Sequence, residues 1–159
     1  MTEIRPARPA DAPRLAELLA QLGYPSEPDA VARRLARMSG SADHEVLVGV
    51  PAGAGVGGAS GGGGASGGGV RVGGYVCVER RLVLERDEHV EITGLVVDSA
   101  ARRSGLGRAL VDAAERWALR HGLHTVVVRS NVVRPESHPF YARIGYRRTT
   151  TSHAYRKEV

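Results

Sequence analysis

Glycines and arginines gather where a predicted strand meets a predicted helix. Arg102, Arg103 and Arg108 surround Gly105 and Gly107. The first N–H groups of a helix have no partner within the helix, and they lie at the positive end of its dipole, where phosphate binds. A glycine carries no Cβ, so a ligand can approach its backbone closely. The spacing therefore predicts a phosphate-binding loop that continues into a helix.

Two other kinds of glycine-rich loop do not fit this segment. A dinucleotide fingerprint needs a third glycine where this chain has Leu110. A P-loop needs Lys and then Ser or Thr after its second glycine, where this chain has Arg108 and Ala109. An ordinary strand–loop–helix connection, with glycines that only permit turning, stays open from this loop alone.

Two motifs in the chain resemble those of one enzyme family. The order R-x-x-G-x-G at 102–107 resembles the acyl-CoA pyrophosphate loop of the GNAT N-acetyltransferases. The pattern R-x-x-S-H-x-F-Y-x-x-x-G-Y at 134–146 resembles their C-terminal motif, with Ser137 and Tyr146 in place of the usual Ala and Phe. Because two linked motifs are far more specific than one, the chain is identified as a member of this family.

The resemblance implies transfer of an acetyl group from acetyl-CoA to a primary amine, by direct attack within a ternary complex. Tyr141 matches the family tyrosine that protonates the CoA sulfur, so we expect it to be the general acid. Glu91 stands where some members carry a base, and Glu79 is the reserve. The alternatives are that Tyr141 packs against Phe140, that Glu91 is a surface carboxylate, and that the chain is a catalytically silent, acyl-CoA-binding regulatory module.

The residues expected at acetyl-CoA lie on one strand end, the loop and the first helical turn, where backbone N–H groups would meet the ligand. They are Leu95, Val96, Val97, Arg102, Arg103, Ser104, Gly105, Leu106, Gly107 and Arg108, with Asn131 after the next strand. For Asn131, a loop-capping role is an equal alternative.

Hydrophobic periodicity predicts one α/β (α+β) domain over residues 1–159, with the GNAT order of elements. We expect a central mixed sheet of six to seven strands and about four helices. The strands are expected at 4–7, 44–50, 70–84, 89–97, 125–129, 146–151 and 153–157, and the helices at 11–22, 28–38, 105–121 and 137–144. Gly94 predicts a bulge in the fourth strand, and the run 125–129 is typical of a buried strand.

A stretch rich in Gly, Ala and Ser covers residues 52–69. It has too few apolar side chains to offset the entropy lost on ordering. We therefore interpret it as a flexible, dispensable insertion between two strands.

The net charge of +5 does not favour nucleic acid as the partner, although a basic chain invites that reading. The arginines are spread along the chain, and aromatic residues make up 4%. Cys77 is the single cysteine of the sequence, so an internal disulfide is excluded, and we expect Cys77 to be a core residue.

The sequence also bears on cellular location, metal binding, oligomeric state and the acceptor. With no apolar run or leader-like segment, we expect a cytoplasmic protein with no membrane partner. The histidines show no ligand spacing, so we expect no metal. Homodimers are frequent in the family, but no feature here decides this. The acceptor is a small-molecule or peptidyl amine that the sequence does not identify. An acidic cluster would suit a cationic amine, or it could be a solvated turn: Glu79, Glu85, Asp87, Glu88 and Glu91.

Overall fold

The computed structural model describes residues 1–52, 71–130 and 135–159. It divides into two compact units, Met1–Arg129 and Ser130–Val159, and each is considered by itself. The expected insertion at 52–69, apart from Ala52, and the expected ligand contact Asn131 lie outside the described residues.

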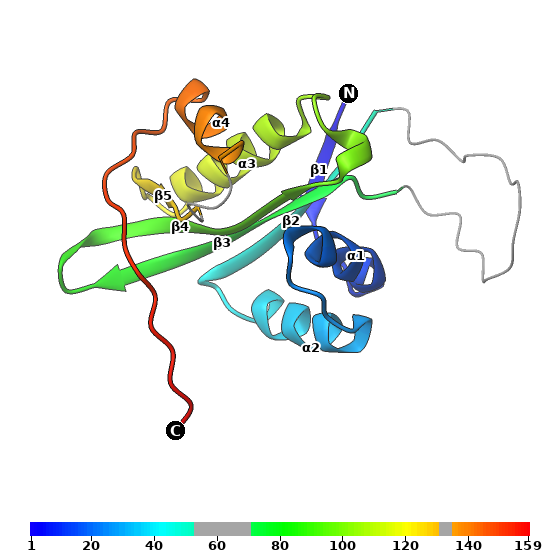
Figure 1. Cartoon of the computed structure of the whole chain (residues 1–159), viewed down its shortest axis with the longest axis horizontal. Coiled ribbons are helices and arrows are strands. Elements are labelled where there is room, and N and C mark those ends of the chain that lie inside the picture. Colours follow the sequence, from blue (N-terminus) through cyan, green and yellow to red (C-terminus); the bar gives the residue numbers. More distant parts are fainter. Residues whose placement is uncertain (53–70, 131–134) are drawn as a thin grey trace, which may run out of the picture. The chain divides into compact units, whose positions relative to one another are not determined.

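The first unit is built around a five-stranded sheet in the order β1-β2-β3-β4-β5. Neighbouring strands are antiparallel except for β4 and β5, which run parallel because α3 connects them as a crossover (Figure 1). This confirms the mixed sheet. The elements are β1 (Glu3–Pro6), α1 (Ala12–Leu22), α2 (Pro28–Ser39), β2 (His44–Val50), β3 (Gly74–Val83), β4 (Arg86–Val97), α3 (Leu106–Arg120) and β5 (Val126–Val128).

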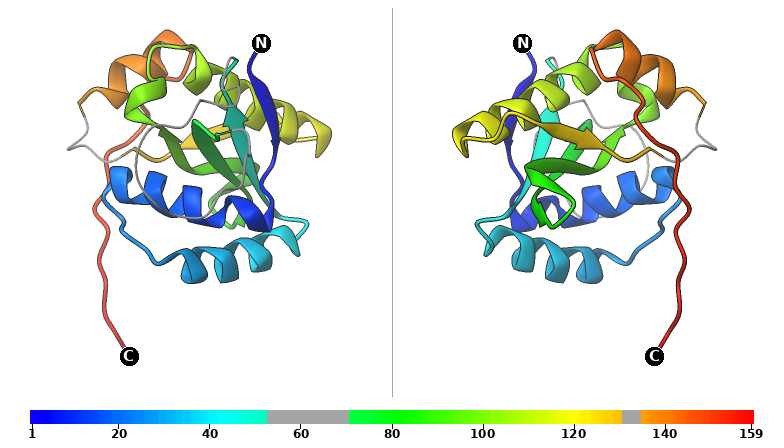
Figure 2. Two further views of the ribbon diagram at one scale, coloured as in Figure 1. Left: turned by 90° about the vertical axis from the view of Figure 1, so that its right-hand side faces the viewer. Right: turned by 90° about the vertical axis from the view of Figure 1, so that its left-hand side faces the viewer.

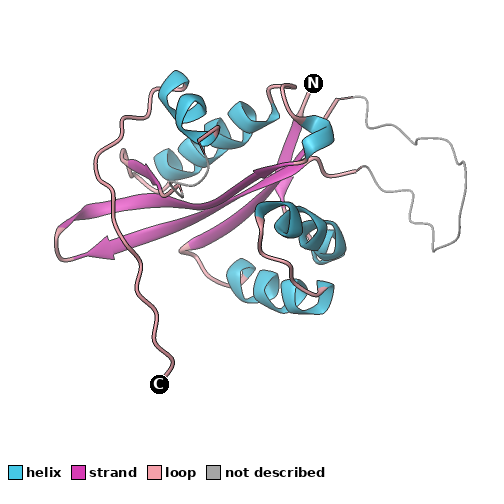
Figure 3. Cartoon of the chain, viewed as in Figure 1, coloured by secondary structure: helices cyan, strands magenta, loops and turns pink. Residues whose placement is uncertain are grey.

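Helices cover both faces of this sheet (Figures 2 and 3). On one face, Leu15 and Leu18 of α1 and Leu35 of α2 pack into a core with Val46 and Val48 of β2. On the other face lies α3, whose apolar side is buried. The amphipathic stripes read from the sequence therefore decide which side of each helix faces the sheet.

Gly49 lets the start of α3 lie close against the sheet. A Cβ on Gly49 would come within 2.5 Å of Leu106 Cδ1, so a larger residue would require the Leu106 side chain or the helix to shift. Leu106 and Leu110 are both almost completely buried at this contact. The first turn of α3, and with it the preceding loop, is thereby fixed against the middle strands.

The predicted bulge in β4 is confirmed. Cys77 pairs with Gly94 and Val78 pairs with Ile92, so Thr93 is an extra residue opposite the β3 ladder. Thr93 is exposed. A bulge bends its strand and interrupts the alternation of faces. Residues before and after Thr93 therefore do not follow a single two-residue alternation along β4.

Three expectations about strands need correction. The segments 146–151 and 153–157 form no strand, and residues 147–159 are exposed. The described part of the chain thus holds five strands, not six or seven. Strand propensity acts only where a pleated surface offers neighbours. The third correction concerns the run 125–129, which was expected to be a buried strand. Its strand, β5, is half-buried, because it forms an edge of the described sheet.

Within its described residues, the second unit has one helix, α4 (Ser137–Arg143), close to the expected bounds. Over the ranges that the structure describes, no helix is both long and apolar enough to cross a membrane.

Candidate active site

The loop after β4 has two residues in the left-handed conformation. Arg103 has φ +62° and Gly105 has φ +82°, and Gly105 immediately precedes α3. Arg103 is unusual, because a side chain makes this conformation costly. Ser104 lies between them and its Oγ donates to the carbonyl oxygen of Ala101 at 2.6 Å. Such left-handed turns orient backbone N–H groups toward one concave side, which suits an anion.

Asp98 ties the beginning of this loop to α1. Its Oδ1 accepts a hydrogen bond from the N–H of Ala100 at 2.9 Å, and Nη2 of Arg14 donates to its Oδ2. Arg14 also donates from Nε to the carbonyl oxygen of Val72 at 2.9 Å. Gln21, about two helical turns further along α1 than Arg14, accepts a hydrogen bond at its Oε1 from the N–H of Ser99 at 3.1 Å. The loop is therefore held by α1 as well as by its own backbone.

The same contacts control the charge of Asp98. Only 6% of this residue is exposed. The hydrogen bond from the Ala100 N–H, followed by that from Arg14, lowers the pKa of Asp98 to about 2. Asp98 is thus an ionised carboxylate at neutral pH, and it lies at the strand end from which the loop departs.

The expected cofactor residues fall into two groups. Leu106 and Val96 are buried, so their side chains contribute to the core and only their backbone could face a ligand. Arg102 and Arg103 are exposed. Arg108 is also exposed, but its Nε lies 2.8 Å from Oδ1 of Asp112. The structure therefore leaves Arg102 and Arg103 as the better placed cations. The other residues of this set (Leu95, Val97, Ser104, Gly105 and Gly107) lie along the same strand end, loop and first turn.

Glu91 is a buried carboxylate rather than a surface one. Only 6% of the residue is exposed. Its Oε1 lies 3.1 Å from Nε of Arg129, and its Oε2 lies 3.7 Å from Nε of Arg81. Oε2 is buried without a hydrogen bond to any described residue. Glu91 therefore keeps one oxygen with capacity to accept a proton or a hydrogen bond.

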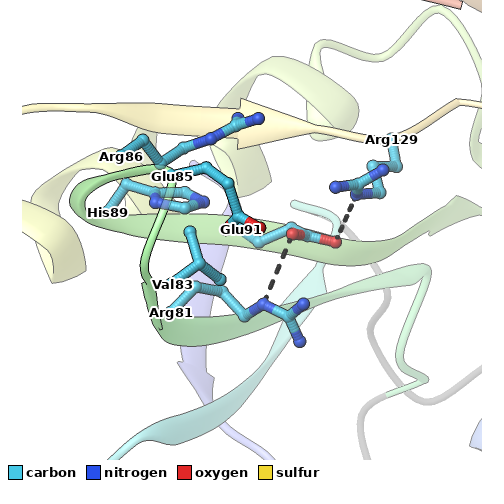
Figure 4. Close-up of a pocket in the computed structure, with 7 residues that line it drawn as sticks. All are labelled: Arg81, Val83, Glu85, Arg86, His89, Glu91 and Arg129. Atoms are coloured by element: carbon cyan, nitrogen blue, oxygen red, sulfur yellow. Dashed lines mark ion pairs between the residues drawn. The ribbon is translucent and has the colours of Figure 1, made fainter. Parts of the chain in front are cut away.

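A pocket of about 340 Å³ opens beside Glu91. Its wall comes from the β3–β4 hairpin and from the residue just after β5 (Figure 4). Most of the lining side chains can carry charge: Arg81, Val83, Glu85, Arg86, His89, Glu91 and Arg129. The pocket is large enough for a small polar molecule.

The reserve base Glu79 lies directly across the ladder from Glu91. Arg81 stands between the two candidates, with Nη1 3.3 Å from Oε1 of Glu79. His44 approaches the same carboxylate, with Nε2 at 3.9 Å. Glu88 pairs with Arg80. Most of the acidic cluster expected from the sequence is thus matched by cations and does not form a uniformly negative surface.

Tyr141 lies in α4 of the second unit. Its ring packs edge-to-face with Phe140 at a centroid distance of 5.2 Å and with Tyr146 at 6.0 Å. The packing expected as the alternative is therefore present. These contacts involve the aromatic ring, so the role of the Tyr141 hydroxyl as general acid stays a prediction.

A family model for the Acetyltransferase (GNAT) family matches residues 43–146, a span that includes the glycine–arginine loop, Glu91 and Tyr141. The chain belongs to this family. A Bacillus subtilis (strain 168) protein, called uncharacterized N-acetyltransferase YhdJ, is 35% identical over 80 residues. That region is 50% of this chain and 55% of the relative, so the chain matches about half the length of this curated relative.

Solved structures share the GNAT fold across almost the whole chain. A transcriptional regulator from Bacillus halodurans C-125 has a TM-score of 0.79 at 20% identity, over 99% of this chain and 100% of that one. AAC(6')-Iy, in complex with the bisubstrate analogue CoA-S-monomethyl-acetylneamine, has a TM-score of 0.77 at 16% identity, over 100% and 99% of the two chains. At these identities the likeness demonstrates a common fold.

Sequence reasoning missed four residues of this candidate site, namely Arg14, Asp98, Arg81 and Arg129. Asp98 had a readable signal, since an Asp after a strand and before a short turn commonly caps that turn with its side chain. The arginines had none, because their partners are set by strand register and by helix packing.

Cys77 lies outside this candidate site. Burial raises the pKa of its thiol to about 12, which argues against Cys77 as a nucleophile.

Proposed function

We propose that this GNAT domain transfers an acetyl group from acetyl-CoA to a primary amine, by direct attack within a ternary complex. The observation that carries the proposal is the loop with two left-handed residues, Arg103 and Gly105, at the start of α3. This backbone suits a pyrophosphate, and exposed guanidinium groups stand beside it. The AAC(6')-Iy complex with a CoA analogue, a protein of the same fold, supports CoA as the ligand.

The bulged end of β4 would accommodate the rest of the cosubstrate. From Glu91 to Val97 the strand spans roughly 20 Å. An extended pantetheine arm would run along this strand from the loop toward Glu91. The backbone groups of Leu95, Val96 and Val97, which follow the bulge at Thr93, would meet the arm and the thioester carbonyl. A backbone N–H at the carbonyl oxygen would stabilise the negative charge that develops there.

The protein's own groups would manage two protons. Attack by the amine nitrogen forms a C–N bond and breaks the thioester C–S bond. The nitrogen gives up a proton, which Glu91 would accept at Oε2, directly or through a water. The departing sulfur takes up a proton, which Tyr141 would supply from its hydroxyl. The products are the N-acetylated amine and CoA with a free thiol, and no group of the enzyme becomes acetylated.

The first test is a calorimetric titration of the protein with acetyl-CoA, with ATP and NADH as controls, followed by an amine screen that measures released thiol. We expect micromolar binding of acetyl-CoA alone, and turnover with at least one amine. Binding without turnover on any amine would favour a silent acyl-CoA-binding module instead. Absence of binding would overturn the loop as a CoA site.

The role of Tyr141 has its own test. We expect Tyr141→Phe to lower kcat by about 10²-fold, because general acid catalysis contributes on that scale. The ring contacts with Phe140 and Tyr146 are retained in this variant, and the Kd for acetyl-CoA should stay close to the wild-type value. Steady-state kinetics and calorimetry measure both quantities. An unchanged kcat would remove Tyr141 from the mechanism and leave it a packing residue.

A further inference from the structure

The pocket beside Glu91 presents both signs of charge to one small volume. Three guanidinium groups and two carboxylates line it, together with a largely buried His89. His89 Nδ1 lies 3.1 Å from the carbonyl oxygen of Asp87, which fixes the ring. A ligand in this pocket therefore meets charged side chains on several sides (Figure 4).

Two of the guanidinium groups are already engaged. Arg81 and Arg129 approach the two oxygens of Glu91, and Arg81 also contacts Glu79. Arg86 differs from them: it is exposed and has no ion pair with any residue that the structure describes. Arg86 is therefore the cation with the most unused capacity for an anionic ligand group.

The carboxylates also differ in what they offer. Glu91 is buried, and its Oε2 receives no hydrogen bond from the described residues. Glu85 lines the same pocket and lies in the turn before Arg86. An ammonium or amine group near Glu91 and Glu85 would supply the missing hydrogen-bond donor. A buried acceptor without a partner costs free energy, so filling it favours binding.

We infer that the acceptor is an amine that also carries an anionic group, a carboxylate or a phosphate, with its nitrogen at Glu91 and its anion at Arg86. This inference rests on the proposed transferase function. A polycation would bring its second positive charge toward Arg86, the lining guanidinium that has no ion pair with a described residue, and like-charge repulsion opposes this. A neutral amine would leave Arg86 without a partner. A molecule bearing both charges satisfies each side of the pocket.

A matched series of amines tests this. n-Butylamine, 4-aminobutyrate and 1,4-diaminobutane share a four-carbon chain and a primary amine, and they differ only in the far group. We expect kcat/KM to be at least about 10-fold higher for 4-aminobutyrate than for the other two, because hydrogen bonds to charged groups contribute on that scale. 3-Aminopropyl phosphate, in a parallel arm, shows whether phosphate is preferred over carboxylate. Equal kcat/KM values, or a preference for 1,4-diaminobutane, would overturn the inference.

Arg86→Ala tests whether Arg86 confers the preference for an amine with an anionic group. We expect the ratio of kcat/KM for 4-aminobutyrate over n-butylamine to fall by about 10-fold in this variant, and Arg86→Glu to shift the preference toward 1,4-diaminobutane. Arg116→Ala, which removes an exposed arginine from α3, is the matched control and should keep the wild-type ratio. A ratio unchanged by both Arg86 variants would refute the assignment of Arg86.

A binding measurement separates this inference from the proposed function. Calorimetric titration with 4-aminobutyrate and with 3-aminopropyl phosphate needs no acetyl transfer. If acetyl-CoA is neither bound nor turned over, the transferase proposal fails. Binding of either probe that is lost in Arg86→Ala would still support the pocket as a site for an anionic amine. No binding of either probe, in an enzyme that acetylates other amines, would overturn the inference alone.

Discussion

The loop before α3 and the pocket beside Glu91 are built in different ways. The loop is shaped by its backbone, with left-handed residues at Arg103 and Gly105 and with Asp98 held by α1. The pocket is shaped by side chains, and one of them is the carboxylate of Glu91 between two guanidinium groups. A backbone site suits a ligand part that never varies, such as a pyrophosphate. A side-chain site can change its specificity by single substitutions without loss of the loop.

The difference also predicts how each region fails. Loss of a side chain that supports the loop should weaken folding and cofactor binding together. Loss of a side chain in the pocket should change catalysis and acceptor choice and leave acetyl-CoA binding nearly unchanged. Substitutions in each region, and a deletion outside both, would therefore have effects of different kind and size.

We expect Asp98→Ala to lower the free energy of unfolding by about 3 kcal/mol, because Arg14 would lose its buried partner and keep only the exposed Glu17, and the N–H of Ala100 would lose its acceptor. Side-chain exposure is 15% for Arg14 and 8% for Asp98. The Kd for acetyl-CoA should rise as well. Chemical denaturation measures the first effect and calorimetry the second. Asp112→Ala is the matched control, since it breaks the exposed pair with Arg108 and should cost less than about 1 kcal/mol. Equal losses in the two variants would contradict a structural role for the Asp98–Arg14 pair.

The Asp98 contribution should also depend on pH. The pKa of this carboxyl in the folded protein is about 2, below the ordinary value of 3.8. Its stabilising effect is therefore fully present above about pH 4 and is lost as the pH falls from 4 toward 2. The difference in unfolding free energy between wild type and Asp98→Asn should narrow over that interval. A difference that stays constant down to pH 2 would rule out this linkage.

In the pocket, we expect Glu91→Gln to lower kcat by about 10²-fold if Glu91 accepts the amine proton. The amide keeps the shape and cannot serve as a base at neutral pH. The Kd for acetyl-CoA should change by less than about 3-fold, in contrast to Asp98→Ala. Glu88→Gln, on the same strand and paired with Arg80, is the control. A normal kcat with lower stability would show that Glu91 only anchors Arg81 and Arg129.

The same contrast explains what could be predicted from the sequence. The loop was predictable in part because Gly105 permits the left-handed conformation just before α3, which is a local property, whereas the left-handed Arg103 gave no such signal. The pocket was not, because the pairing of Glu79 with Glu91 and the approach of Arg129 depend on register. A one-residue slip sends a strand side chain to the other face, and the bulge at Thr93 introduces such a slip within β4. Strands at 146–157 were wrongly expected for a related reason, since a strand needs a partner edge that propensity does not supply.

A substitution at Gly105 tests whether the loop binds acetyl-CoA mainly through its backbone. Gly105→Ala should raise the Kd for acetyl-CoA by about 10-fold, because a Cβ makes the left-handed conformation costly by 1–2 kcal/mol. No described atom lies within 4 Å of the added Cβ, so the effect would be conformational rather than steric. Gly122→Ala is the control, since Gly122 has φ +72° and equal space at the other end of α3. Arg103→Gly, which keeps the left-handed turn, should raise the Kd less than Gly105→Ala. The reverse order would make the side-chain charge the main determinant.

The smallest effect is expected from shortening 52–69 to a tight turn. The strand ends on either side are paired independently of it: Gly49 lies opposite Gly74, and the N–H of Gly73 donates to the carbonyl oxygen of Gly49 at 2.8 Å. A shorter closed loop loses less entropy, so stability should rise by about 1 kcal/mol at most. The deletion must stop before Val72, whose carbonyl accepts from Arg14. A longer deletion that includes Val72 is therefore the control and should destabilise the protein. Thermal unfolding and acetyl-CoA titration of both variants distinguish a dispensable connection from a structural one, because only the latter would lose the folded state in the shorter deletion.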